Sequence, residues 1–93
     1  MQDEIIKRHR KLISVLGKII KNYRIKQGKT IYAISAEVSM SKSTWREVEE
    51  GICNDIKLST IWKIAEGLDI SVSVLMNELS SELGESFSLS DID

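Results

Sequence analysis

Residues 39–51 read SMSKSTWREVEEG, and this segment has the pattern of one short helix between two boundary residues. Ser41 is a favoured N-cap residue, and Gly51 is a typical helix stop. Between them, Trp45 and Val48 are spaced so that they share one helical face. The pattern predicts a short helix over residues 42–50 that turns Trp45 inward and leaves polar side chains outside.

A second short helix is expected immediately before this one. Thr30 is a suitable N-cap, and apolar residues then recur at near-helical spacing: Ile31, Ile34, Ala36 and Val38. This spacing predicts a helix over residues 31–38. Residues 39–41 then interrupt it, so two short helices flank a three-residue turn.

The rest of the chain also shows helical periodicity, and it contains no proline. An amphipathic helix is expected over residues 4–26, with Gly28 as its stop. Ser59 is the expected cap of a fourth helix and Ser71 of a fifth over residues 72–79. The apolar members of the fourth are Ile61, Trp62, Ile64, Ala65 and Leu68. The sequence predicts an all-α, five-helix domain with Trp45 and Trp62 in its core.

At 93 residues, the chain has room for one domain. We expect residues 1–15 to extend the first helix and residues 16–79 to form the domain. Residues 80–93 are serine-rich and carry only acidic charges, which favours a flexible tail. Phe87 and Leu89 alternate with serines there, which leaves open a strand that orders on dimerisation.

Charge is distributed unevenly along the chain. Residues 1–30 carry nine Lys or Arg against Asp3 and Glu4, whereas residues 31–93 carry four against twelve Asp or Glu. The two segments therefore have net charges of +7 and −8. Such polarity favours either contact of the first segment with a polyanion or mutual neutralisation within a dimer.

Three stretches in this order resemble the lambda-repressor-like (Cro/cI, Xre) helix-turn-helix proteins. LGKIIKNYRIKQGKT (16–30) is similar to the family's first helix and the entry to the second, and SMSKSTWREVEEG to its turn and recognition helix. STIWKIAEGLDISVSVLMNEL (59–79) is similar to its last two helices. The resemblance implies a regulator that binds double-stranded DNA sequence-specifically, with the recognition helix in the major groove.

The resemblance also implies roles for individual residues. It places Lys42, Ser43 and Glu47 against bases, and Thr30, Ser41 and Thr44 at a phosphate or the groove edge. Arg46 suits a phosphate as well as a base. Apart from the resemblance, Lys21 and Lys29 at the end of the first helix are the nearby positive charges expected to contact phosphates. In side-chain chemistry, Lys42 suits guanine and Glu47 suits the amino group of cytosine. The resemblance further implies an ion pair between Arg24 and Glu49, to which a bidentate guanidinium is well suited.

The sequence offers no constellation for catalysis or metal binding. His9 has no carboxylate or cysteine partner at ligand spacing, and Cys53 is the only cysteine. We therefore expect no enzyme activity and no cofactor. No apolar run is long enough to span a bilayer, so the expectation is a cytoplasmic protein without a membrane partner.

Two questions of assembly stay open at this stage. A homodimer is expected, because pairing doubles the number of base contacts. The apolar residues of the N-terminal extension (Ile5, Ile6, Leu12 and Ile13) would pack on a dimer partner or on the fifth helix of the same chain. In the dimer, the cations Lys7, Arg8, Arg10 and Lys11 would lie near Glu78, Glu82 and Glu85 of the neighbour. The alternative function is a protein-interaction module, antitoxin-like or accessory, with a protein partner and weak or no DNA binding.

Overall fold

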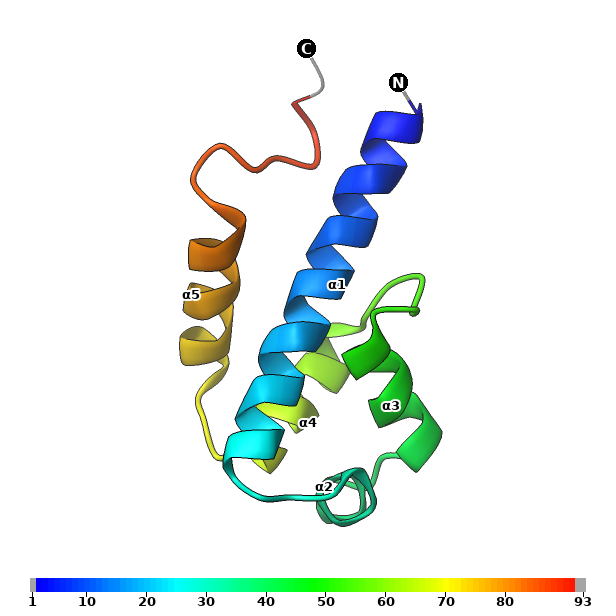
Figure 1. Ribbon diagram of the computed structural model, residues 1–93, viewed down its shortest axis with the longest axis vertical. Helices are drawn as coiled ribbons and strands as arrows, with labels where there is room; N and C mark the ends of the chain where they lie inside the picture. The colour runs from blue at the N-terminus through cyan, green and yellow to red at the C-terminus, as the bar shows by residue number, and fades with distance from the viewer. Residues whose placement is uncertain (1, 92–93) are drawn as a thin grey trace.

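The computed structural model describes residues 2–91, and these form five α-helices and no strand (Figure 1). The helices are α1 (Gln2–Lys26), α2 (Ile31–Glu37), α3 (Lys42–Glu50), α4 (Leu58–Gly67) and α5 (Val72–Leu83). The predicted all-α, five-helix fold is confirmed. Met1, which begins the expected extension, and residues 92–93, which end the expected tail, lie outside the described residues.

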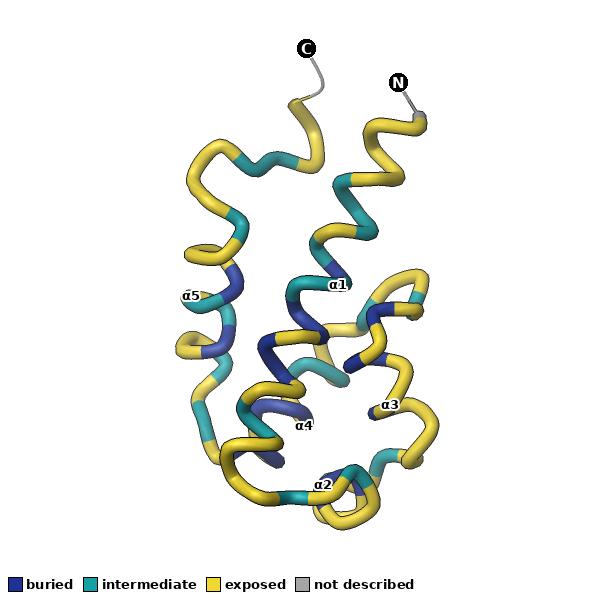
Figure 2. The backbone as a smooth tube through the Cα atoms, in the orientation of Figure 1, coloured by how far each residue is buried: buried dark blue, intermediate teal, exposed yellow. Residues whose placement is uncertain are grey.

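The long helix α1 organises the molecule. It runs along most of the 43 Å long axis, with α5 on one side and α3 on the other, while α4 lies behind it and α2 crosses below (Figure 1). Buried residues occupy the sides of the helices that face one another (Figure 2). No helix among residues 2–91 combines the length and apolar composition needed to cross a membrane.

Every helix contributes a completely buried side chain to one core. These side chains are Ile20 of α1, Ile34 of α2, Trp45 of α3, Ile64 of α4 and Leu75 of α5. Burying a large apolar side chain stabilises a fold by about 1.5–3 kcal/mol. The core therefore fixes α3 relative to the other four helices, and the predicted inward position of Trp45 is confirmed.

Three of the four predicted caps are present. The hydroxyl oxygens of Thr30, Ser41 and Ser71 accept hydrogen bonds from the backbone N–H groups three residues later, at 3.0, 3.1 and 3.1 Å. The fourth prediction, Ser59, is wrong. Helix α4 begins two residues earlier than a cap at Ser59 would place it, after Lys57, whose extended backbone makes it the N-cap without a side-chain hydrogen bond. The N–H of Ile61 donates to the carbonyl of Lys57 at 3.1 Å and closes the first turn.

Helix α5 is longer than expected. It continues past Leu79 to Leu83, so the predicted boundary between residues 79 and 80 falls inside this helix. Leu83 packs against the core, and this contact keeps the two serines before it helical. The chain then returns beside the start of α1, where the guanidinium of Arg8 donates to the carbonyls of Ser88, at 3.0 Å, and Asp91.

The second tryptophan corrects another prediction. Trp62 is not a core residue, because 55% of its surface is exposed. It lies on the side of α4 that no other helix covers, next to Leu58, which is 70% exposed one turn earlier. The apolar residues of α4 extend around more of its circumference than this chain can bury.

The apolar stripe of the N-terminal extension is divided. Ile13 is buried and Leu12 packs against the core of its own chain, whereas Ile5 and Ile6 stay exposed. Part of the stripe is thus satisfied without a second molecule.

Candidate nucleic-acid interface

Helix α3 presents one complete side to solvent. Trp45, Val48 and Glu49 are its buried residues. The α3 side chains for which DNA contacts were predicted are all exposed: Lys42, Ser43, Thr44, Arg46 and Glu47. A helix with one free side and about 10–12 Å across fits the major groove of B-DNA.

The ends of α3 are set by local chemistry. The Ser41 hydroxyl accepts the N–H of Thr44 and donates to its side-chain oxygen at 2.6 Å. At the other end, Gly51 has φ of +69°, the left-handed conformation that glycine adopts without steric cost. The free side of α3 therefore has a defined start and length.

The turn between α2 and α3 is held by backbone hydrogen bonds. The N–H of Met40 donates to the carbonyl of Ser35 at 2.9 Å, and Ser39 adopts φ of +55°. The buried Ser35 hydroxyl donates back to the carbonyl of Ile31 at 2.6 Å. These contacts fix the angle at which α2 meets α3.

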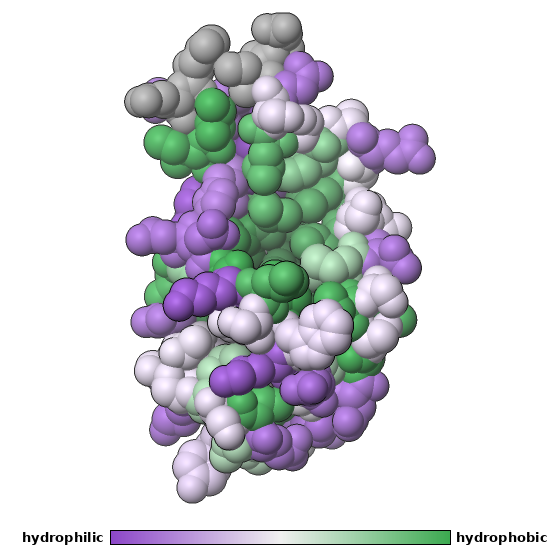
Figure 3. Space-filling model, turned by 180° about the vertical axis from the view of Figure 1, so that it is seen from behind, coloured by the Kyte–Doolittle hydropathy of each residue, from purple (hydrophilic) through white to green (hydrophobic). Residues whose placement is uncertain are grey.

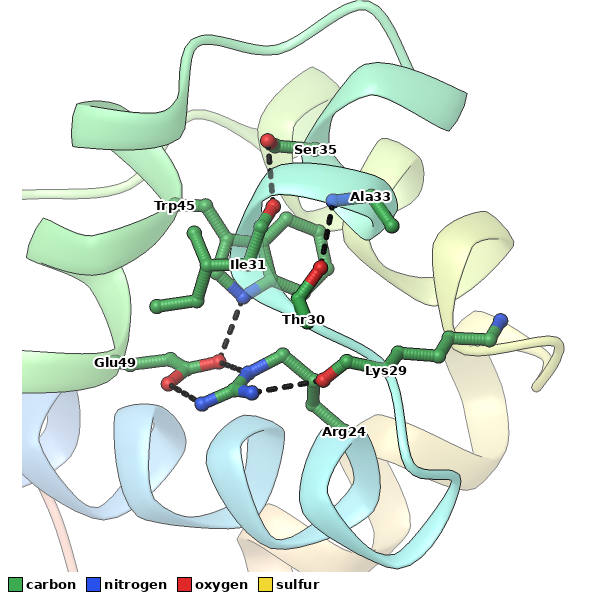
Figure 4. Close-up of polar contacts among 8 residues, drawn as sticks. All are labelled: Arg24, Lys29, Thr30, Ile31, Ala33, Ser35, Trp45 and Glu49. Carbon is green, nitrogen blue, oxygen red and sulfur yellow. Dashed lines mark hydrogen bonds and ion pairs between the residues drawn. The ribbon is translucent and has the colours of Figure 1, made fainter.

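A buried polar network joins α3 to α1 (Figure 4). Arg24 donates from Nε to Glu49 Oε2 at 2.6 Å and from Nη2 to Oε1 at 2.9 Å, so the implied ion pair is present and bidentate. The indole Nε1 of Trp45 donates to the same carboxylate at 2.7 Å. The hydrogen bonds that Arg24 donates to Glu49 raise the pKa of Arg24 above its ordinary value, although burial opposes the rise.

This network changes the charge that α3 shows to a ligand. Residues 42–50 carry three glutamates against Lys42 and Arg46, a formal charge of −1. Arg24 neutralises Glu49 beneath the helix, so the exposed charges, Lys42 and Arg46 against Glu47 and Glu50, sum to zero. Lys21 of α1 shares a hollow of about 210 Å³ with Arg46 and adds one positive charge there.

A close backbone contact, missed in the sequence, sets the distance between α1 and α3. A Cβ atom at Gly17 would lie 2.3 Å from the carbonyl oxygen of Val48, far inside contact distance. Only glycine permits this approach. The signal was present, because a glycine inside a helical pattern weakens the helix and often marks a packing requirement.

Lys29 and Thr30 lie at the entrance to α2. The Lys29 ammonium donates to the carbonyl of Gly67 at 2.8 Å and lies 3.5 Å from a carboxylate oxygen of Asp69. It is thus engaged at the end of α4, and the structure does not bring it together with Lys21. The Thr30 side chain is exposed at the start of α2, where its oxygen caps the helix.

Arg10 and His9 of the N-terminal extension contact the loop that follows α3, which the sequence did not predict. The guanidinium of Arg10 donates to the carbonyl of Cys53 at 2.9 Å and to that of Gly51, while His9 Nε2 lies 2.5 Å from the carbonyl oxygen of Asn54. A cation at the end of a helix also offsets its negative dipole. Arg10 therefore stabilises the C-terminal end of α3.

The described residues around α3 offer little support for nucleophilic catalysis or metal binding. Cys53 lines a hollow of about 400 Å³ between α3 and the following loop, and burial, with the charge of Glu47, raises the pKa of its thiol. Such a thiol is a weak nucleophile at neutral pH. Among residues 2–91, no group of three or more His, Cys, Asp or Glu side chains is placed to hold a metal ion.

A comparison of the chain with known protein families agrees with this arrangement of helices. A family model described as helix-turn-helix, of the Cro/cI/Xre-like type, matches residues 20–75, which is more than half of the 93-residue chain. The matched segment runs from α1 into α5 and contains the turn and all of α3. No curated protein matches the chain.

Proposed function

The chain belongs to the Cro/cI/Xre-like helix-turn-helix family, and we propose that it is a transcriptional regulator that binds a specific sequence of double-stranded DNA through α3. The observation that carries the proposal is the free side of α3. Its polar residues point outward, while Trp45, Glu49 and Arg24 hold the helix from beneath. A preformed reading helix avoids the entropy cost of ordering on binding.

Three residues of α3 read bases in this proposal. Lys42 donates to guanine O6 or N7, Glu47 accepts from cytosine N4, and Ser43 contacts a neighbouring base edge. All three are exposed and lie in the first two turns, which in helix-turn-helix proteins face the base edges. Their exposure supports the assignment, because the charged ends of Lys42 and Glu47 are accessible to a bound duplex.

The remaining residues position the helix on the DNA backbone. Lys21 and Arg46 share one hollow at the junction of α1 and α3, so both reach the same phosphate region. Thr30, Ser41 and Thr44 lie at the groove edge. Lys29 is assigned a phosphate only if its ammonium leaves the carbonyl of Gly67, which makes it the weakest member of the set.

A homodimer completes the proposal. Two copies would place two α3 helices about 34–36 Å apart, one turn of the double helix, on a two-fold-related site. Pairing also compensates for the neutral charge of the α3 surface, because each copy adds its own Lys21 and Arg46. Affinity for DNA depends strongly on such neutralisation of phosphates.

Selection from a random duplex pool tests the function. The chain is incubated with fluorescent duplexes of random sequence, bound molecules are amplified, and anisotropy is measured on the enriched duplex. We expect one enriched sequence and binding that weakens as salt rises. Lys21→Ala should weaken binding to every duplex alike, whereas Lys11→Ala, at another exposed cation of α1 that is not assigned a DNA contact, serves as the matched control.

The outcomes separate the two function classes. Enrichment of no sequence, with anisotropy unchanged by Lys21→Ala, contradicts reading of DNA by α3. The protein-interaction module would then be the better account, since α5 and the chain after it expose an acidic surface with Glu82 and Glu85.

A further inference from the structure

Arg10 of the N-terminal extension binds both sides of one residue at the end of α3. Its Nη1 donates to the carbonyl of Cys53 at 2.9 Å, and its Nη2 donates to the carbonyl of Gly51. These carbonyls flank Ile52, the first residue of the loop between α3 and α4 (residues 52–57). The planar fork of a guanidinium holds two acceptors in one fixed geometry, which a single ammonium does not.

Ile52 connects this contact to Glu47, one of the proposed base-reading residues. The N–H of Ile52 donates to the carbonyl of Glu47 at 3.2 Å, so the loop is bonded to the backbone of the reading residue. Glu47 also lines the hollow of about 400 Å³ together with Cys53 and Asn54 of the loop. A shift of the loop therefore changes both the backbone and the surroundings of Glu47.

The two ends of α3 depend on different contacts. At the start, Lys42 follows the Ser41 hydroxyl, which accepts the N–H of Thr44 at 3.1 Å. This cap is local to α3 and involves no residue of α1. Glu47 lies one turn before the end of the helix that Arg10 binds. Loss of the Arg10 contact should therefore disturb Glu47 and leave Lys42 in place.

The contact belongs to a continuous junction between α1 and the end of α3. Ser14, one turn after Arg10, is so close that a Cβ atom at Gly51 would lie 3.0 Å from its Cα. One residue before Arg10, His9 Nε2 lies 2.5 Å from the carbonyl oxygen of Asn54. Among the described residues, Arg10 is half-buried and forms no ion pair, so its guanidinium is committed to backbone carbonyls.

The loop lies on the side of the molecule that presents α3. In Figure 1, α3 and this loop are beside α1, whereas α4 lies behind it. Figure 3 views the molecule from behind, and apolar side chains run down the middle of that view. A polyanionic duplex is attracted to cations rather than to apolar side chains, so we expect the duplex on the side of α3 and the loop.

We propose that Arg10 is a positioning residue for the reading of DNA. By holding the carbonyls on both sides of Ile52, it sets where Glu47 meets its base. The proposal rests on the proposed function, in which Glu47 accepts a hydrogen bond from cytosine. It gives the N-terminal extension an influence on base preference without any contact between Arg10 and the duplex.

Anisotropy on a series of substituted duplexes tests the position of Glu47. The duplex enriched by the wild type is changed one base pair at a time, and Glu47→Ala identifies the pair that Glu47 reads. A base contact is worth about 5- to 150-fold in preference. Arg10→Ala should lose most of this preference at the same base pair and keep the preference that Lys42 provides. Added to Glu47→Ala, it should cause no further loss at that pair, because Arg10 acts through Glu47.

Arg8→Ala is the matched control. It removes the same side chain two residues away, where the guanidinium donates to the carbonyl of Ser88 in the tail at 3.0 Å. Both variants lose one positive charge, so a general loss of attraction to DNA affects them alike. Only Arg10→Ala should change base preference. Arg10→Lys keeps the charge without the fork and should fall between the wild type and Arg10→Ala.

Hydrogen exchange without DNA reports the contact itself. Exchange of the Ile52 N–H should accelerate about tenfold or more in Arg10→Ala, because its hydrogen bond to Glu47 opens more often, and should stay unchanged in Arg8→Ala. Circular dichroism confirms that each variant keeps its helices. If Arg10→Ala does not fold, the comparison of Arg10→Lys with the wild type takes its place in both experiments.

Three results would overturn the proposal: an Arg10→Ala variant with the base preference of the wild type at the Glu47 pair, an equal loss at every pair, or additive losses in the double variant. The function is assessed separately by selection with the wild type. A wild type that enriches one sequence while Arg10→Ala keeps every preference retains the proposed function and loses this inference. A wild type that enriches no sequence loses both.

Discussion

The two tryptophans, on the consecutive helices α3 and α4, differ in burial. Trp45 of α3 is completely buried in the core, and its indole N–H donates a hydrogen bond to Glu49. Trp62 is 55% exposed on α4, beside an open hollow. Both satisfy the same helical periodicity in the sequence. Periodicity therefore identifies an apolar face, whereas burial of that face depends on whether another helix of the chain packs over it.

Replacement of each tryptophan by alanine should give the largest contrast. Trp45→Ala should lower the free energy of unfolding by about 3–5 kcal/mol, because it opens a cavity in the core and removes a hydrogen bond from Glu49. Trp62→Ala should change the stability of the monomer by about 0.5 kcal/mol or less. Urea unfolding at a concentration where the chain is monomeric gives both values. Equal losses would contradict the assignment of one tryptophan to the core and one to the surface.

The carboxylate beneath Trp45 should show the next effect. Glu49→Gln leaves Arg24 without its charged partner and should destabilise the chain by about 1.5–3 kcal/mol. Glu50→Gln, the same change at the adjacent exposed residue, should stay within about 0.5 kcal/mol. Thermal unfolding of the two variants makes the comparison, and a similar loss in both would show that the buried network contributes little.

The close contact of α1 with α3 predicts a comparable or smaller loss. Gly17→Ala places a Cβ atom 2.3 Å from the Val48 carbonyl, so α3 must shift and stability should fall by about 1–3 kcal/mol. Lys18→Ala, on the exposed side of α1, provides the control. Amide hydrogen exchange in α3 should accelerate only in the Gly17 variant. An alanine that stabilises the chain through its better helix propensity would contradict the tight contact.

The smallest effect concerns pH and the contact of α1 with α5. Burial, reinforced by a hydrogen bond to Glu78 at 3.1 Å, raises the pKa of Tyr23 above its ordinary value. A raised folded-state pKa adds stability below the unfolded value of about 10, and this stability is lost as pH rises through the folded value. Tyr23→Phe should therefore flatten the decline of stability above pH ~10, while Tyr32→Phe, at a 73% exposed position, should retain it. Identical alkaline profiles for the wild type and Tyr23→Phe would contradict this contact.

Features encoded by neighbouring residues were predictable from sequence. The caps Thr30, Ser41 and Ser71 depend on a hydroxyl and an N–H group three residues later, so local chemistry decides them. The N-cap at Lys57 was not predicted, because it depends on backbone conformation alone and its side chain forms no capping hydrogen bond. Helix α5 exceeded its expected length because Leu83 finds a distant packing partner, which the surrounding serines do not reveal.

The candidate interface likewise contains features that the sequence predicts and features that it does not. The free side of α3 follows from its periodicity, and the contact between Arg24 and Glu49 follows from the family resemblance. The clamp of Arg10 on the carbonyls of Gly51 and Cys53 could not be predicted, because backbone carbonyls are present at every residue. The position of Lys29 against Gly67 was hidden for the same reason.

The base preference of the Lys42→Ala variant decides whether α3 reads DNA. Wild type and variant are each selected against the same random duplex pool, and anisotropy then measures their affinities for the two enriched duplexes. Reading by α3 predicts that the variant loses preference at one base position, by about 1–3 kcal/mol, and keeps the preferences elsewhere. An unchanged preference with unchanged affinity would contradict the assignment of α3 as the reading helix.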